Sequence, residues 1–130
     1  MAVNKDMNVL IVDDYKTMLR VIRNLLGQIG FKNVDEASDG KQALELIGQK
    51  NYGLIISDWN MEPMSGLDLL KSVRAKPDVP VAQTPFIMIT AENKMDNVIA
   101  AKQAGVNNYI VKPFSAERLK DKMSSVLGEI

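Results

Sequence analysis

Short apolar runs alternate with amphipathic stretches along the whole chain, and this alternation restricts the possible folds more than any other feature. Four of the five runs are continuously apolar, which is typical of strands that are covered on both faces of a sheet. The second run is mostly polar, so we expect it near an edge of the sheet. The runs are residues 9–12, 33–37, 54–56, 86–89 and 109–111.

Amphipathic helices are predicted between these runs and after the last one. Their apolar residues recur at helical spacing, and residues that favour helix N-termini precede three of them. Gly30 and Gly105 stand where helices are expected to end. The strict alternation with short crossovers predicts an α/β domain, a parallel sheet with helices on both faces. The predicted caps are Asp39 with Gln42, Ser65 with Asp68, and Ser115.

The composition excludes several classes of protein. A length of 130 residues fits one domain, and 16 basic against 16 acidic residues leave no basic field for nucleic acid or for a membrane surface. The absence of cysteine and histidine excludes thiol and Ser-His catalysis and zinc sites of the usual kind. No signal peptide is visible, and no apolar run approaches the ~18 residues of a membrane span. We therefore expect a cytoplasmic protein.

Polar residues follow four of the predicted strands at the point where each strand ends. Asp13 and Asp14 follow the first strand, Asp58 the third, Thr90 the fourth and Lys112 the fifth. The carboxyl ends of parallel strands lie along one edge of a sheet, and ligands of open α/β sheets bind in the crevice there. These five side chains are therefore expected to converge on one crevice.

The chemistry of this set indicates a magnesium-dependent phosphoryl acceptor. Carboxylates that share a small cleft repel one another, and an oxygen-only ligand set suits Mg²⁺. Asp58 stands alone after the central strand and is the candidate nucleophile, while the pair Asp13 and Asp14 serves the metal. The Lys112 ammonium and the Thr90 hydroxyl can contact the oxygens of a transferred phosphoryl group.

At these positions the sequence resembles the receiver domains of two-component response regulators, and among them it is similar to CheY-type chemotaxis proteins. The likeness covers essentially all 130 residues. It implies a flavodoxin-like, doubly wound, five-stranded parallel sheet of order 2-1-3-4-5 with five helices. It also implies a single receiver domain over residues 1–130 with no output domain. Receiver motifs are matched at residues 10–14, 57–61, 64–66, 89–92 and 111–114, and CheY-type features at 58–60, 90–92, 100–105 and Tyr109.

The resemblance implies how the metal is held. Asp58 would be the phosphorylation site. Asp14, Asp58 and the backbone carbonyl of Asn60 would bind Mg²⁺ directly, and Asp13 would bind it through water.

The resemblance also implies catalytic roles for four residues. Lys112 and Thr90 would contact the phosphoryl group, and the bond from Lys112 to Pro113 is expected to be cis. Asn60 and Glu92 would orient an attacking water, giving self-catalysed hydrolysis within seconds to minutes. The chain would thus catalyse its own phosphorylation and dephosphorylation without being an enzyme in the usual sense.

A switch and a partner face follow from the same resemblance. Phosphorylation would draw Thr90 toward the phosphoryl group and let the Tyr109 ring turn inward, which is a shift between two packings. The face that binds partners would also contain Lys94, Val98 and Lys122. The implied partners are a sensor histidine kinase and the flagellar motor switch protein, with room for a dedicated phosphatase, and the chain itself would be a monomer.

Alternative functions remain open at this point. A stand-alone receiver can also be a phosphorelay intermediate, a phosphate sink or a regulator of a cell-cycle kinase. An aspartate-nucleophile phosphatase would need a second acid two residues after Asp58, where Asn60 stands. Flavin binding would need a phosphate-cradling loop after the first strand, and this sequence has two acids there instead. One departure from the family pattern is Glu62 before Pro63, where an acid enters the loop and could interact with the metal site or pair with Lys112.

Overall fold

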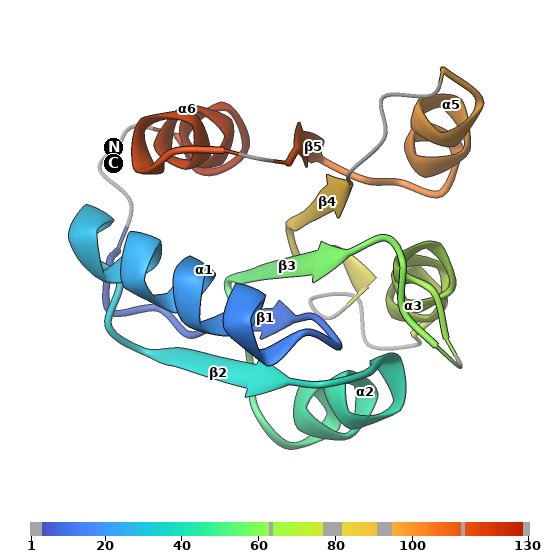
Figure 1. Cartoon of the computed structure of the whole chain (residues 1–130). Coiled ribbons are helices and arrows are strands. Elements are labelled where there is room, and N and C mark those ends of the chain that lie inside the picture. Colours follow the sequence, from blue (N-terminus) through green and yellow to red (C-terminus); the bar gives the residue numbers. More distant parts are fainter. Residues whose placement is uncertain (1–3, 63, 77–81, 91–94, 113, 129–130) are drawn as a thin grey trace.

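The computed structural model describes residues 4–62, 64–76, 82–90, 95–112 and 114–128. Its sheet has five parallel strands in the order β2-β1-β3-β4-β5, which confirms the predicted topology. Five helices alternate with them in the described residues (Figure 1). The strands are β1 (Val9–Val12), β2 (Val34–Ala37), β3 (Leu54–Asp58), β4 (Phe86–Thr90) and β5 (Asn108–Val111). The helices are α1 (Lys16–Ile29), α2 (Gly40–Gln49), α3 (Gly66–Arg74), α5 (Met95–Gln103) and α6 (Ala116–Leu127).

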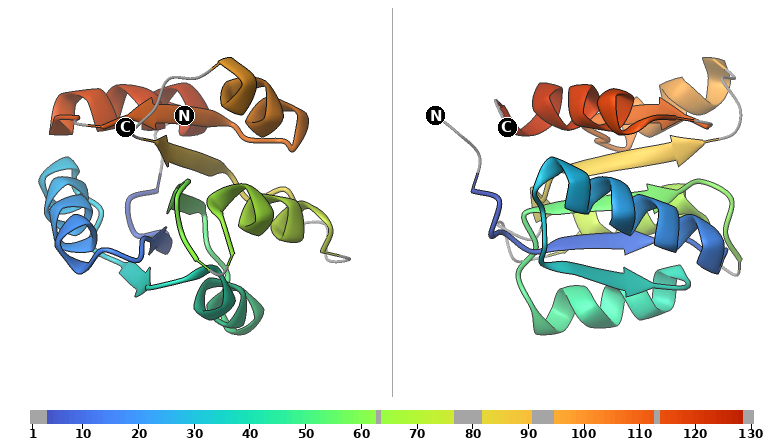
Figure 2. Two further views of the ribbon diagram at one scale, coloured as in Figure 1. Left: turned by 45° about the vertical axis from the view of Figure 1, so that its right-hand side comes forward. Right: turned by 60° about the vertical axis from the view of Figure 1, so that its left-hand side comes forward.

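Both faces of the sheet are covered, as the continuously apolar strands predicted. Helices α1 and α6 lie on one face, and α2, α3 and α5 on the other (Figure 2). Side chains of β1 alternate between the two cores: Val9 and Ile11 pack with α1 and α6, whereas Leu10 and Val12 pack with α2 and α3. All four are fully buried. None of the described helices combines the length and the apolar character needed to cross a membrane.

The predicted helix ends are confirmed, with one difference in detail. The side chains of Asp39, Ser65 and Ser115 each accept a hydrogen bond from the backbone N–H three residues later. The Gln42 side chain, however, accepts from the N–H of Ser38 at 2.7 Å, one residue before the cap. At the other end of two helices, Gly30 and Gly105 have φ of 116° and 94°, a left-handed conformation that favours glycine.

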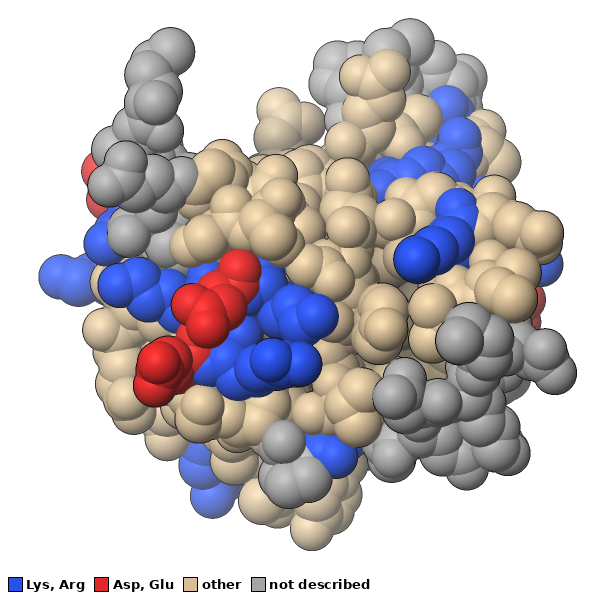
Figure 3. All heavy atoms as spheres, turned by 90° about the horizontal axis from the view of Figure 1, so that it is seen from above, with Lys and Arg blue, Asp and Glu red and all other residues tan. Residues whose placement is uncertain are grey.

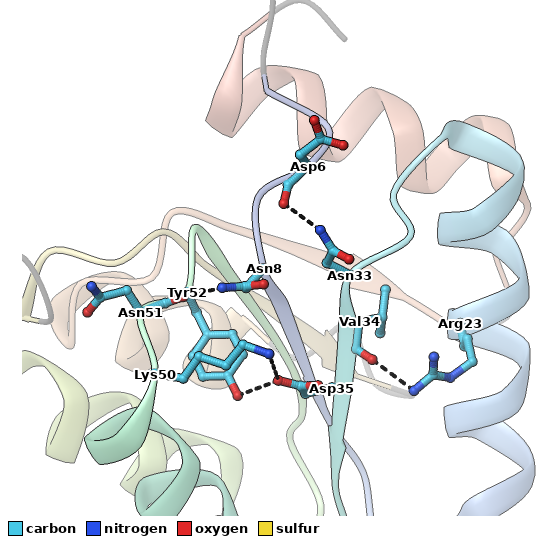
Figure 4. A network of polar contacts seen from close by, with 9 residues as sticks. All are labelled: Asp6, Asn8, Arg23, Asn33, Val34, Asp35, Lys50, Asn51 and Tyr52. Atoms are coloured by element: carbon cyan, nitrogen blue, oxygen red, sulfur yellow. Dashed lines mark hydrogen bonds and ion pairs between the residues drawn. The ribbon is translucent and has the colours of Figure 1, made fainter.

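Polar contacts hold the edge strand β2 to its neighbours (Figure 4). The carboxylate of Asp35 accepts from Lys50 Nζ at 2.9 Å and from the Tyr52 hydroxyl at 2.8 Å, which ties β2 to the end of α2 and the loop before β3. On the other side, Arg23 of α1 donates to the Val34 carbonyl at 2.9 Å. Charged side chains along an edge strand also discourage pairing with a strand of another molecule.

The Asp35 contacts make stability depend on pH in a defined direction. The hydrogen bonds from Lys50 and then Tyr52 hold the pKa of Asp35 below its usual value of 3.8. A lowered folded-state pKa gives stability that is present above the unfolded pKa and is lost as the pH falls through the folded one. We expect Asp35→Asn to lower the free energy of unfolding by about 1 kcal/mol near neutral pH, with a smaller effect near pH 3. Urea unfolding at both pH values measures this. An equal loss of stability at both pH values would contradict this prediction. The control variant is Asp121→Asn, which removes an exposed acid from α6.

Candidate functional site

Three carboxylates gather at the carboxyl ends of β1 and β3. Asp13 and Asp14 follow β1, and Asp58 is the last residue of β3. These strands are direct neighbours in register, with Val12 beside Ser57, so the next residue of each strand lies at the same level. One oxygen from each of the three acids lies within 4.8 Å of the others. Asp13 and Asp58 are buried, whereas Asp14 is exposed.

Backbone contacts fix the two buried acids. Asp13 Oδ1 accepts a hydrogen bond from the Tyr15 N–H at 2.9 Å, which turns the chain from β1 into α1. The backbone at Gly66, at the start of α3, packs directly on the backbone of Asp58. The approach is so close that a Cβ at Gly66 would lie 2.2 Å from the Asp58 carbonyl oxygen. The N–H of Gly66 donates to the Trp59 carbonyl at 2.9 Å. Only glycine permits this close approach. The sequence reasoning did not assign this role to Gly66, although the residue lies within a matched motif.

Lys112 supplies the positive charge at the site. Its Nζ lies 3.0 Å from Asp58 Oδ1 and 3.8 Å from Asp13 Oδ2. Its backbone N–H donates to the carbonyl of Thr90 at 2.8 Å, so the ends of β4 and β5 are joined beside the acids. Thr90, the last residue of β4, is buried. The structure thus brings together all five polar residues that the strand ends predicted. The suggested pairing of Glu62 with Lys112 is not found among the described residues.

The acids exceed the positive charge that faces them. Burial raises the pKa of Asp13 to about 6. The backbone hydrogen bond from Tyr15 opposes this rise, and the negative charge of Asp58 adds to it. Burial also raises the pKa of Asp58, and Lys112 opposes this. Asp13 Oδ2 and Asp58 Oδ1 are buried and, within the described residues, have no well-aligned hydrogen bond despite the nearby ammonium. Buried oxygens of this kind fit a hard divalent cation such as Mg²⁺.

An open cleft lies beside Asp14, the exposed member of the three acids. Its volume is about 290 Å³, and Asp14, Asn60, Met61 and Glu62 line it. At roughly 30 Å³ for each water molecule, that is space for roughly nine or ten waters, enough for a hydrated cation beside a phosphoryl group. Asn60 is exposed there, so its side chain is open to a group bound in the cleft.

The predicted partner face is described in part. Tyr109 of β5 is half-buried, and Lys122 of α6 places its Nζ 5.2 Å from the centre of the tyrosine ring, a cation–π contact. Val98 on α5 is half-buried. Glu92 and Lys94 lie outside the described residues, and so does Pro113 with its predicted cis bond.

Residues 9–124 of the chain match the response regulator receiver domain. This chain belongs to the response regulator receiver family. The receiver is 48% identical over 127 residues to the chemotaxis protein CheY-3 of Vibrio cholerae. The matched residues cover 98% of this chain and 96% of that protein. The family accounts for the strand order and for the position of the acids.

Solved structures agree with this assignment. The receiver superposes on the chemotaxis protein CheY4 of Vibrio cholerae with a TM-score of 0.87, at 32% identity, covering 94% of this chain and 99% of that one. The receiver domain of a sensor histidine kinase from Pseudomonas aeruginosa PAO1 gives a TM-score of 0.84 at 26% identity, with 95% and 99% covered. In that structure a magnesium ion is coordinated in the active site cleft.

The crowding of acids predicts that a mutation at the site stabilises the metal-free receiver. The raised pKa of Asp13 means that its charged form costs folding free energy above about pH 6 and little below its ordinary pKa of 3.8. We expect Asp13→Asn to raise the free energy of unfolding by about 1–3 kcal/mol at about pH 7.5 in EDTA, and by less at about pH 4.5. Urea unfolding at the two pH values tests this. A destabilised variant, or a gain that does not change with pH, would contradict the expectation.

Proposed function

We propose that this receiver is a chemotaxis response regulator that accepts a phosphoryl group on Asp58 and then binds a partner, most directly the flagellar motor switch. The observation that carries the proposal is the arrangement of Asp58, a buried carboxylate 3.0 Å from Lys112 and within 4.8 Å of two further acids. The similarity to the chemotaxis proteins CheY-3 and CheY4 supports a role in chemotaxis signalling. The donor would be a sensor histidine kinase, and the receiver would act as a cytoplasmic monomer.

The acids are proposed to hold Mg²⁺. Asp14, Asp58 and the backbone carbonyl of Asn60 would bind it directly, with Asp13 acting through water. The two buried oxygens without a well-aligned hydrogen bond support this assignment, as does the magnesium ion in the cleft of the kinase receiver domain. Bound Mg²⁺ supplies positive charge against the oxygens of the phosphoryl group.

The chain's own groups would carry out the transfer. A carboxylate oxygen of Asp58 forms a bond to phosphorus while the bond from phosphorus to the donor histidine nitrogen breaks. The electron pair of that bond stays on the imidazole nitrogen, which takes up a proton, and an acyl phosphate remains on Asp58. Lys112 and the Thr90 hydroxyl would contact the oxygens of the transferred group. Hydrolysis would follow by attack of a water oriented by Asn60 and Glu92, and would regenerate the carboxylate.

The output is proposed to pass through the face formed by α5, β5 and α6. Tyr109 and Lys122 already contact each other there, at the free edge of the sheet. Viewed from this side, acidic side chains lie within a group of basic ones over α6, and a band of uncharged surface separates this group from further basic side chains on the side of α5 (Figure 3). Repacking of Tyr109, together with Val98 and Lys94, would change this face when Thr90 moves toward the phosphoryl group.

Phosphorylation at a single position is the first test. With an acyl phosphate or a phosphorylated kinase and Mg²⁺, radiolabel should attach to the wild-type chain and not to Asp58→Asn. Trp59, which follows the acceptor and is half-buried, should change its fluorescence on addition of Mg²⁺ and again with the donor. Asp121→Asn controls for loss of a remote acid. Label on the Asp58→Asn variant would show that the acceptor has been misassigned.

Partner capture distinguishes the circuits. We expect the phosphorylated receiver to bind a flagellar motor switch protein at least about tenfold more tightly than the unphosphorylated form, since the partner must favour one packing of the output face. Tyr109→Ala should remove most of this difference while leaving labelling of Asp58 unchanged. Rapid return of the phosphoryl group to a histidine phosphotransfer protein, with no binding to the motor protein, would instead favour the phosphorelay or phosphate-sink alternative.

A further inference from the structure

A further carboxylate, that of Glu62, lines the cleft beside the clustered acids. Glu62 is exposed on the loop between β3 and α3 and lines the cleft together with Asp14 and Asn60. In the described part of the chain, the acids with oxygens within 4.8 Å of one another are Asp13, Asp14 and Asp58. Glu62 is not one of them. Glu62 therefore faces the same open space from a greater distance and does not share the ligand positions of the other acids.

The charge of Glu62 adds to a site that is already short of cations. Lys112 forms its described ion pairs with Asp13 and Asp58, and no ion pair of Glu62 is found among the described residues. The two oxygens that face Lys112, Asp13 Oδ2 and Asp58 Oδ1, are buried and have no well-aligned hydrogen bond in the same part of the structure, so one ammonium leaves both short of positive charge. A cation is needed at the inner acids, and Glu62 extends the negative potential to the mouth through which ions and donors enter.

We propose that Glu62 is a specificity-determining residue of the phosphoryl-transfer site, which strengthens Mg²⁺ binding and slows transfer from small dianionic donors. The inference rests on the proposed function and deepens it by naming the class of donor that the site disfavours. One negative charge at the mouth attracts a doubly positive ion and repels a doubly negative one, and the two effects share a cause. Dissolved salt screens both effects, because the cleft is open to solvent.

The electrostatic origin separates donors by charge. An acyl phosphate such as acetyl phosphate is a dianion near neutral pH, whereas phosphoramidate carries a single negative charge. The barrier that Glu62 sets should therefore be larger for acetyl phosphate. A phosphorylated protein donor is expected to be less affected, since its own surface charges accompany the phosphoryl group into contact with the cleft.

The test replaces Glu62 by an uncharged residue of the same shape. For Glu62→Gln we expect the Kd for Mg²⁺, titrated by Trp59 fluorescence, to rise about two- to fivefold. With each protein saturated with Mg²⁺, labelling of Asp58 by acetyl phosphate should be about two- to fivefold faster, and labelling by phosphoramidate should change less. Both changes should shrink in about 0.5 M KCl. Glu62→Asp, which keeps the charge, and Glu45→Gln, which removes an exposed acid from α2, should behave as wild type.

The outcomes separate this inference from the function on which it rests. A wild-type chain that is never labelled at Asp58 overturns the proposed function itself. A labelled wild type with an unchanged Kd, or an unchanged acetyl phosphate rate, in Glu62→Gln overturns only the role of Glu62. The same shifts in Glu45→Gln, or shifts that persist undiminished at high salt, also overturn it, because they would show a general effect of net charge or a change of local structure.

Discussion

The repulsion among Asp13, Asp14 and Asp58 is the constraint around which the rest of the structure is organised. Two of these acids are buried, and one lysine ammonium lies close to them. Burying carboxylates with too little positive charge costs folding free energy. The two apolar cores on either side of the sheet offset that cost. Burial of whole strands such as β1 and β3 keeps the strand ends rigid enough to hold like charges within 4.8 Å of one another.

The same imbalance makes the site responsive to ligands. A site whose charges were already balanced would gain little from a cation or a phosphoryl group, whereas this one has buried oxygens ready to be bound. Lys112 is the link to the rest of the fold, because its backbone is hydrogen-bonded to Thr90 at the end of β4 and because it directly follows β5, which carries Tyr109. In the proposed function, this connection joins the acceptor site to the strand that forms the output face.

The pattern of apolar runs was sufficient for the alternation of strands and helices and for the convergence of the acids, because both follow from where each run ends. The strand order came from the resemblance to receiver domains. Neither was sufficient for contacts that depend on loop paths and rotamers. The approach of Gly66 to the Asp58 carbonyl results from the turn into α3, and the ion pairs of Lys112 with Asp58 and Asp13 depend on its side-chain rotamer. The side chain of Gln42 likewise bonds to Ser38 instead of the cap residue. Each of these contacts depends on a local loop path or a side-chain rotamer, which a pattern of residue types does not encode.

Strand order also explains which residue type stands at each position of the site. Adjacent strands lie about 4.8 Å apart, so β4 is one spacing from the acceptor on β3, and β5 is about 10 Å away. In the proposed function the short hydroxyl of Thr90 comes from the near strand. Lys112, directly after the far strand, reaches Asp58 Oδ1 at 3.0 Å because an ammonium on a flexible four-carbon stem spans the second spacing. On the other side β1 contributes short acids next to β3. Side-chain length therefore increases with distance from Asp58, and a shorter residue at position 112 would leave the acceptor without its cation.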